Sequence, residues 1–131
     1  VCADFTKRLV EIEKGQQEPV LKHGNLTTQR AITDVRDIIR AFDIALDKAT
    51  VGEVYNLSGE KAYRMSEIVE ILKGLVNFDF ELQQDPKLTR PSDEPIIYGD
   101  NSKFKNETGW RQEISLEQTL RDMLDYWRKT L

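Results

Sequence analysis

The sequence predicts a mixed α/β fold in a single domain. Segments with helical and strand-like hydrophobic patterns alternate along the 131 residues, as they do in α/β proteins. A chain of this length is long enough for one domain with a buried core. Its composition, 39% hydrophobic and 32% charged, is typical of a globular protein rather than of a disordered chain. We therefore expect one α/β domain over residues 1–131.

Apolar residues at helical spacing predict four main helices. The first, over residues 5–12, should end near Gly15. The other three are expected over residues 35–46, with Asp34 or Thr33 as N-cap, over 68–76, with Ser66 as N-cap, and over 116–127, where Ser115 and Gln118 have capping-box spacing. A shorter helix over residues 101–108 should end at Gly109 in a left-handed cap.

Five short apolar segments predict strands, at residues 19–24, 30–33, 53–59, 80–83 and 95–99. The segment 53–59, EVYNLSG, is the most apolar, and we expect it to join a larger parallel sheet. The strands are few and short for a self-contained sheet, and the sequence begins at Val1 without a methionine. We therefore expect a fragment whose missing strands lie upstream. Such a fragment should expose the apolar faces of 53–59 and of the helix at 34–48.

Charge and composition argue against several classes of partner. The net charge is -4 and acids alternate with bases, whereas nucleic-acid binders and polybasic membrane anchors have basic faces. No apolar run reaches the length of a membrane span, and no signal-peptide pattern is present. Cys2 is the single cysteine, which excludes an internal disulfide and a thiolate zinc site. We expect a cytoplasmic protein with no nucleic-acid, membrane or metal partner.

No complete catalytic set is present in the sequence. It contains no G-x-G-x-x-G turn, P-loop or G-x-S-x-G elbow. The single histidine, His23, is interpreted as a surface residue of the turn KHGN. Asp34 and Asp37 are interpreted as charges at a helix end and on a solvated face. We therefore expect no catalytic residue in this chain.

Two arginines on connecting segments suggest anion binding. Arg30 lies between a Gly-Asn turn and a capped helix, and Arg90 lies in a corner held by Pro91. Guanidinium groups offer planar, bidentate donors to phosphate oxygens, and Asp93 is placed to accept hydrogen bonds from a ribose diol. The alternative is that both arginines pair with neighbouring acids such as Asp34 or Asp93.

Three segments carry a resemblance to a known family: GNLTTQRAITDVRDIIRAF (24–42), EVYNLSGEKAYRMSEIVEIL (53–72) and LTRPSDEPIIYGDNSKFKNETGWRQEISLEQTLRDMLDYWR (88–128). Together they resemble the C-terminal half of the extended short-chain dehydrogenase/reductases, the nucleotide-sugar epimerases and dehydratases. The likeness is greatest to GDP-mannose 4,6-dehydratases and GDP-4-keto-6-deoxy-D-mannose reductases. It implies the C-terminal substrate-binding portion of an extended Rossmann-type fold.

The resemblance also implies roles for five residues. Arg30 and Arg90 match arginines that reach the nucleotide diphosphate, and Asp93 matches the acid that takes the ribose hydroxyls. Asn25 lies in the Gly-Asn turn and shapes the pocket. Asp4 lies in the passage against the base, where it either accepts hydrogen bonds from guanine N1 and N2 or N-caps the first helix. One departure is that Ala31 and Ile32 follow Arg30, where the family has an acid and an aromatic residue.

The resemblance places the family's Gly-rich turn and Tyr-x-x-x-Lys pair in an N-terminal Rossmann half, and this sequence contains neither. It thus implies a parent enzyme that uses NAD or NADP on a GDP-sugar and is a homodimer or homotetramer, while this chain alone holds no cofactor and is inactive. Two alternatives remain: a fragment of a UDP-sugar 4-epimerase or of a 4,6-dehydratase for another nucleotide, and a stand-alone nucleotide-binding or interaction module without catalysis.

Overall fold

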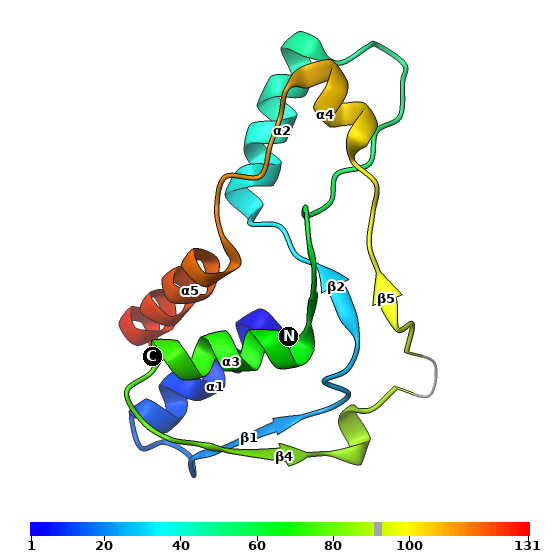
Figure 1. Cartoon of the computed structure of the whole chain (residues 1–131). Helices are drawn as coiled ribbons and strands as arrows, with labels where there is room; N and C mark the ends of the chain where they lie inside the picture. Colours follow the sequence, from blue (N-terminus) through cyan, green and yellow to red (C-terminus); the bar gives the residue numbers. More distant parts are fainter. Residues whose placement is uncertain (91–92) are drawn as a thin grey trace.

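Helices and strands alternate along the chain in a computed structural model that describes residues 1–90 and 93–131 (Figure 1). This confirms the predicted α/β class. In chain order the elements are α1 (Cys2–Glu13), β1 (Val20–His23), β2 (Gln29–Ala31), α2 (Val35–Lys48), β3 (Ala62–Arg64), α3 (Met65–Leu75), β4 (Glu81–Gln84), the 3-10 helix η1 (Pro86–Leu88), β5 (Ile96–Ile97), α4 (Ser102–Thr108) and α5 (Leu116–Thr130).

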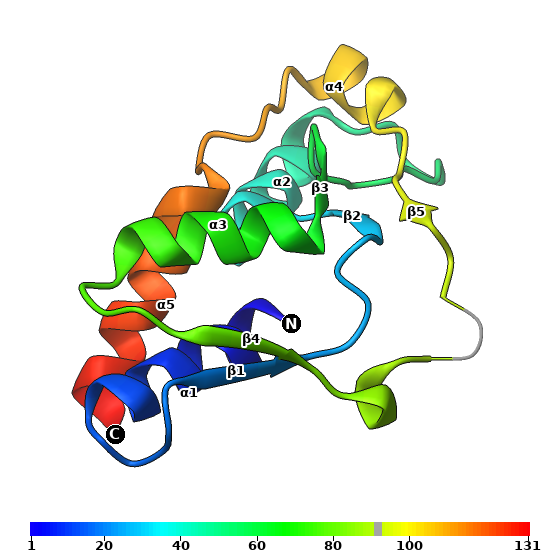
Figure 2. The same ribbon diagram turned by 60° about the horizontal axis from the view of Figure 1, so that its bottom comes forward.

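The main core lies between α1, α3, α5 and a two-stranded parallel sheet. In that sheet β1 pairs with β4, in a register that runs from Val20↔Glu81 to His23↔Gln84 (Figure 2). Because side chains alternate along a strand, β1 directs the fully buried Leu21 into the core. The apolar faces of the three helices supply most of the other core residues: Phe5, Leu9, Val10, Ile12, Met65, Ile68, Val69, Leu72, Leu116, Leu120 and Leu124.

A second sheet connects this core to a smaller one. Strand β2 lies at its centre, antiparallel to β3 and parallel to β5. Beyond it, α2 and α4 pack around Ala41, Phe104 and Trp110. Figure 1 shows α2 and α4 at one end of the molecule and α1, α3 and α5 at the other, joined by β2 and β5.

The structure corrects the prediction for residues 53–59, which form none of the strands in the described part of the chain. The neighbouring strand is β3, at residues 62–64. A strand needs a partner for its backbone hydrogen bonds, which an apolar run cannot supply by itself. Here Val54 is 81% exposed, and Ser58 is held by side-chain contacts to Gly99 and Asn101.

The predicted helix ends are confirmed where the cap is local. The Asp34 carboxylate accepts from the N–H of Arg36 at the start of α2, and the Ser115 hydroxyl accepts from the N–H of Gln118 at the start of α5. Gly109 follows α4 in the left-handed conformation, with φ of 74°. Glycine adopts this conformation without the steric cost that a Cβ adds.

One predicted cap is wrong, and the capping alternative for Asp4 is not observed. Helix α3 begins at Met65 with Arg64 as its N-cap, so Ser66 lies inside the first turn. The N–H groups of Met65 and Ser66 instead donate to the carbonyls of the loop before β2. Asp4 is likewise in the first turn of α1, whose N-cap is Val1. In α3 the tertiary contacts with this loop replace the cap that the local pattern favoured.

The outward face of α2 is apolar. Val35, Ile39, Phe42 and Leu46 recur at helical spacing and are 61–87% exposed. The opposite side of the helix carries the buried Ala41 and packs on the smaller core. No helix in the described part of the chain has the length and apolarity needed to cross a membrane.

Asp37 ties the segment before α5 to the side of α2. It was expected on a solvated face, but its side chain is 1% exposed and accepts hydrogen bonds from the N–H groups of Glu113 and Ile114 and from Arg40. The indole N–H of Trp110 donates to the Asp37 carbonyl at 3.0 Å. A carboxylate can be buried here because several donors replace water.

We expect Asp37→Ala to lower the free energy of unfolding by about 3 kcal/mol, since it removes a buried carboxylate that accepts from the N–H groups of Glu113 and Ile114 and from Arg40. Urea denaturation would measure the change. The matched control is Asp43→Ala on the same helix, where an exposed side chain predicts a change within about 0.5 kcal/mol. Equal losses in the two variants would contradict this account.

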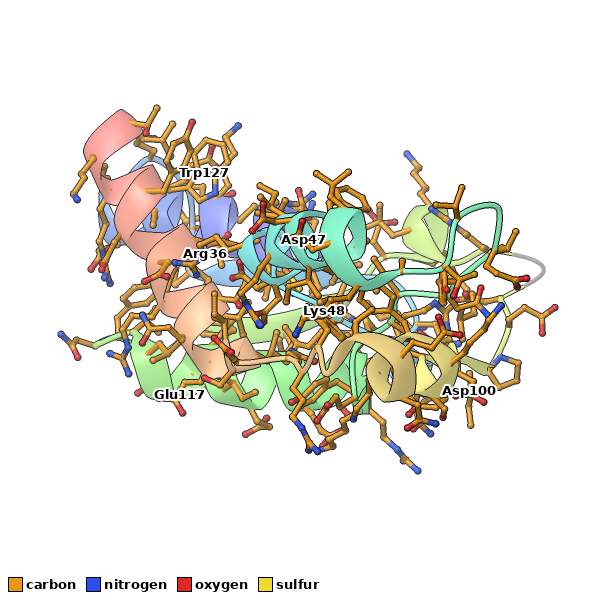
Figure 3. The ribbon with its side chains drawn as sticks, turned by 90° about the horizontal axis from the view of Figure 1, so that it is seen from above. Arg36, Asp47, Lys48, Asp100, Glu117 and Trp127 are labelled. Atoms are coloured by element: carbon orange, nitrogen blue, oxygen red, sulfur yellow. The ribbon has the colours of Figure 1, made fainter. Side chains whose placement is uncertain are left out.

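Asp34 is the second buried acid of α2. Its two oxygens accept from Arg36 at 2.8–2.9 Å and from the hydroxyl of Thr119 at 2.7 Å. Arg36 also forms an ion pair with Asp122 of α5. Figure 3 shows Arg36 between α2 and α5. Hydrogen bonds from Arg36 outweigh the burial and hold the pKa of Asp34 well below its ordinary value.

Asp34 should therefore make stability fall in acid. Because its pKa is lower in the folded chain than the value of about 3.9 in an unfolded chain, its stabilisation is complete above about pH 4 and is lost as pH falls further. Asp34→Asn keeps a capping side chain but removes the charge. We expect the free energy of unfolding of wild type to exceed that of this variant by about 2 kcal/mol at pH 7 and by clearly less at pH 3. Urea denaturation at both pH values would measure the difference. An unchanged difference would refute the assignment.

Candidate functional site

One cleft of about 280 Å³ brings together all five residues that the sequence singled out. Its lining residues come from the start of α1, the end of β1, the turn that follows, β2, the start of α3, the end of η1 and the segment after it. Figure 2 shows how these elements are arranged. Asp4, Asn25, Arg30, Arg90 and Asp93 all line it. The sequence separates these residues by up to about ninety positions, so only the fold places them around one space.

Arg30 and Asp93 form an ion pair at the cleft wall. The guanidinium of Arg30 donates to the Asp93 carboxylate at 2.8 Å and to the carbonyls of Gln29 and Glu94 at 2.8 Å. The two side chains are 27% and 21% exposed. Of the pairings considered from sequence, the one between Arg30 and Asp93 is therefore present. Asp34 pairs with Arg36 instead.

Arg90 lines the cleft from the segment after η1 and is exposed. None of the ion pairs among residues 1–90 and 93–131 involves it. The predicted role of Pro91 in fixing this corner lies outside the described residues. In the described part of the chain, Arg90 is therefore a cation at the cleft with no acidic partner.

Asn25 shapes the turn between β1 and β2. Its side-chain oxygen accepts from the N–H of Thr27 at 2.9 Å and from the Thr27 hydroxyl at 2.7 Å, which is the geometry of an Asx-turn. The carbonyls of Leu26 and Thr28 then accept from the first N–H groups of α3. The turn is thus held by its own side chain and by α3, and among the described residues the amide nitrogen of Asn25 donates no hydrogen bond.

Asp4 is presented to the cleft from the first turn of α1. Its carboxylate accepts from Nε of Arg8 at 3.1 Å, and the same guanidinium donates to the carbonyl of Lys22 at 3.4 Å. Arg8 therefore links α1 to β1 and orients the acid. The Asp4 side chain is 53% exposed, so its second oxygen can accept from a ligand.

Close backbone contact joins the two sides of the cleft at Gly24. A Cβ at this position would lie 2.3 Å from the carbonyl oxygen of Leu88. The neighbouring His23 is half-buried at the end of β1, not in an exposed turn as expected, and its Nδ1 lies 2.9 Å from the Gly24 carbonyl. Only a residue without a side chain lets the β1–β2 turn pack directly on η1.

Sequence reasoning missed Lys22, which also lines the cleft. The signal available was its place in a strand directly before the His-Gly-Asn turn. Thr28, Met65 and Leu88 line the cleft as well and supply its apolar and hydroxyl surface. In the described part of the chain, no three His, Cys, Asp or Glu side chains gather as a metal site would require.

Comparisons with known proteins show the family to which the chain belongs. The family profile described as GDP-mannose 4,6 dehydratase matches residues 1–123. The chain belongs to this family. The match confirms the resemblance to the extended short-chain dehydrogenase/reductases that the sequence motifs carry.

Individual members of the family show the same relation. The GDP-6-deoxy-D-mannose reductase of Pseudomonas aeruginosa is 28% identical over 127 residues, which is 97% of this chain and 42% of that protein. The structure of RMD from Pseudomonas aeruginosa complexed with NADPH superimposes with a TM-score of 0.92 at 26% identity, over 100% of this chain and 42% of that one.

A UDP-glucose 4-epimerase from Thermotoga maritima, solved with UDP-glucose, matches with a TM-score of 0.82 at 28% identity, over 98% of this chain and 39% of that one. The chain thus spans about two fifths of the length of the relatives it matches. Its fold is that of the corresponding part of Rossmann-type family members.

A substitution at Gly24 tests the close packing of this residue on the backbone of Leu88. We expect Gly24→Ala to lower the free energy of unfolding by about 1–3 kcal/mol, because the new methyl group overlaps the Leu88 backbone. Gly74→Ala is the matched control, since nothing lies within 4 Å of a Cβ there and alanine favours a helix by about 0.5–1 kcal/mol. Thermal unfolding of both variants would measure the contrast. If both substitutions were stabilising, the close contact would be absent in solution.

Proposed function

We propose that this chain is the substrate-binding C-terminal part of an NAD(P)-dependent nucleotide-sugar 4,6-dehydratase or 4-keto-reductase, and that its cleft binds the nucleoside diphosphate of a GDP-sugar. The observation that carries the proposal is the convergence of Asp4, Asn25, Arg30, Arg90 and Asp93 on one cleft. The family match and the reductase from Pseudomonas aeruginosa support the choice of substrate class.

The cleft offers chemistry suited to each part of such a nucleotide. Arg90 and Arg30 provide guanidinium donors and positive charge for the diphosphate. Asp93 has a second carboxylate oxygen for a ribose hydroxyl, and the Asn25 amide can donate to the nucleotide. Asp4 supplies the acceptor that the N1–H and N2–H donors of guanine require.

In the parent enzyme these contacts would act away from the reacting carbon. Binding energy from the nucleotide positions the hexose so that its C4 meets the nicotinamide. The cofactor supplies the hydride chemistry, and a dehydratase additionally removes water across C5 and C6. The structure of RMD holds NADPH, which supports NAD or NADP as the parent's cofactor. This chain contributes binding, and we expect it to be inactive alone.

The exposed apolar stripe of α2 fits the same proposal. Four large apolar side chains that face solvent form a surface that water disfavours. In the parent, we expect the N-terminal Rossmann half to cover this stripe and to supply strand partners for residues 53–59. A stand-alone module would leave both unpaired.

A UDP-sugar enzyme is the second candidate, because the Thermotoga maritima UDP-glucose 4-epimerase matches nearly the whole chain. Uracil has one N–H donor on its pairing edge, where guanine offers the neighbouring N1–H and N2–H pair. Asp4 therefore distinguishes the two candidates.

We expect the chain to bind GDP more tightly than UDP in isothermal titration calorimetry. Asp4→Ala should weaken GDP binding roughly tenfold, since it removes an ionised hydrogen-bond acceptor, and should leave UDP binding nearly unchanged. Asp43→Ala on the exposed side of α2 is the control. Undiminished GDP binding by the Asp4 variant would rule out the guanine contact, and a preference for UDP would favour the epimerase alternative.

A further inference from the structure

Strand β4 has one edge without a partner strand. In the described part of the chain it belongs to a two-stranded sheet and pairs only with β1. The N–H of Glu81 donates to the carbonyl of Pro19, just before β1, at 2.8 Å. Because backbone groups alternate in direction along a strand, those of Leu82 and Gln84 point away from β1. Among the described residues, no turn, loop or cap hydrogen bond of the backbone uses them.

This edge has little of the protection that strand edges usually have. Proteins commonly block such edges with lysine, proline, a bulge or a covering segment. The four residues of β4 are all exposed, their register with β1 is continuous, and they carry a single charge, at Glu81. The outer edge of β1 is different, because Arg8 of α1 covers it and donates to the carbonyl of Lys22 at 3.4 Å.

Charge selects one way for two copies of this edge to meet. Identical strands related by a two-fold axis are antiparallel, with the outward backbone groups in the hydrogen-bonded positions. If the axis passes through Leu82, Glu81 lies opposite Gln83 of the second copy, whose amide can donate to the carboxylate. An axis through Glu81 would set that carboxylate against itself, and an axis through Gln83 would set Glu81 against Asp85. Like charges directly opposite each other are unfavourable.

We propose that the free edge of β4 binds β4 of a second copy of this chain, with Leu82 on the two-fold axis. The two parallel pairs then form one four-stranded sheet in the order β1-β4-β4-β1, which is a more stable arrangement than an isolated pair of strands. Figure 1 shows β4 at the end of the molecule opposite α2. The edge is therefore separate from the apolar stripe of α2.

Cysteine cross-linking tests the register. Hydrogen-bonded neighbours in an antiparallel pair have Cα atoms about 5.5 Å apart, which a disulfide can bridge. Leu82→Cys should therefore give a disulfide-linked dimer under mild oxidation, detected by non-reducing electrophoresis. Glu81→Cys is the matched control on the same strand, because residue 81 and its copy are diagonal neighbours about 7–8 Å apart. Equal cross-linking of the two variants, or none in Leu82→Cys, would overturn the proposal.

Sedimentation analysis tests the association itself. We expect the wild-type chain to form a dimer as its concentration rises. Leu82→Lys should raise the dissociation constant roughly tenfold, because it places two like charges on the axis. Circular dichroism checks that the variant is folded, as expected for a change at a side chain that is 38% exposed.

Phe42→Lys is the control for association through the other exposed apolar surface. Phe42 belongs to the stripe of α2 and is 61% exposed, so this variant should dimerise as wild type does. If Phe42→Lys abolished the dimer and Leu82→Lys did not, the association would belong to α2 and the proposal would be wrong.

Hydrogen exchange of single amides gives a readout that does not need a substitution. The amides of Leu82 and Gln84 should exchange fast in dilute protein and slowly in concentrated protein, since the second copy supplies their acceptors. The amide of Gln83 faces β1 and should be protected at both concentrations. Fast exchange of Leu82 and Gln84 at every concentration, or a wild-type chain that always stays monomeric, would refute the pairing. None of these outcomes depends on nucleotide binding in the cleft.

Discussion

The Arg30–Asp93 ion pair and its two accompanying carbonyl contacts determine how the chain returns to the sheet after η1. Strand β5 has only two residues, so its ladder with β2 fixes it weakly. The guanidinium of Arg30 adds hydrogen bonds to Asp93 and Glu94 just before that strand, and the N–H of Gln29 donates to the carbonyl of Pro95. These contacts bring the segment that carries Arg90 against the turn that carries Asn25. The shape of the cleft therefore depends on the contacts of Arg30 with Asp93 and Glu94.

Backbone groups perform much of the positioning on the other side of the cleft. The turn between β1 and β2 offers its carbonyls to the first N–H groups of α3, which removes the need for a side-chain cap there. The absence of a side chain at Gly24 lets this turn approach the Leu88 carbonyl. The residues of this turn are therefore held by a helix whose other face is buried in the core.

The two sides of helix α2 have different environments. One side carries Asp34 and Asp37, which accept hydrogen bonds from α5 and from the segment that precedes it. The opposite side carries the apolar stripe that is open to water. An apolar stripe ordinarily predicts the buried side of a helix, but here it is the side that is exposed to water. The chain belongs to a family that includes longer proteins, such as the Pseudomonas aeruginosa reductase, of which it covers 42%.

The features that could be predicted from the sequence alone depend on residues a few positions apart or on sequence motifs. Asp34, Ser115 and Gly109 cap their helices through neighbours a few residues away, so their roles follow from the sequence pattern. The α/β class follows from alternating periodicity, and the family follows from motifs that extend over nearly the whole chain.

Only the tertiary structure decided the contacts between distant residues. It placed Asp93 on Arg30 across 63 positions, buried Asp37 against a segment 76 positions away, and gave the first N–H groups of α3 to a loop instead of to a cap. Residues 53–59 have strand-like composition but no ladder partner in the described part of the chain. Hydrogen bonding and charge pairing depend on which groups the fold brings within about 3 Å, and local sequence does not encode that distance.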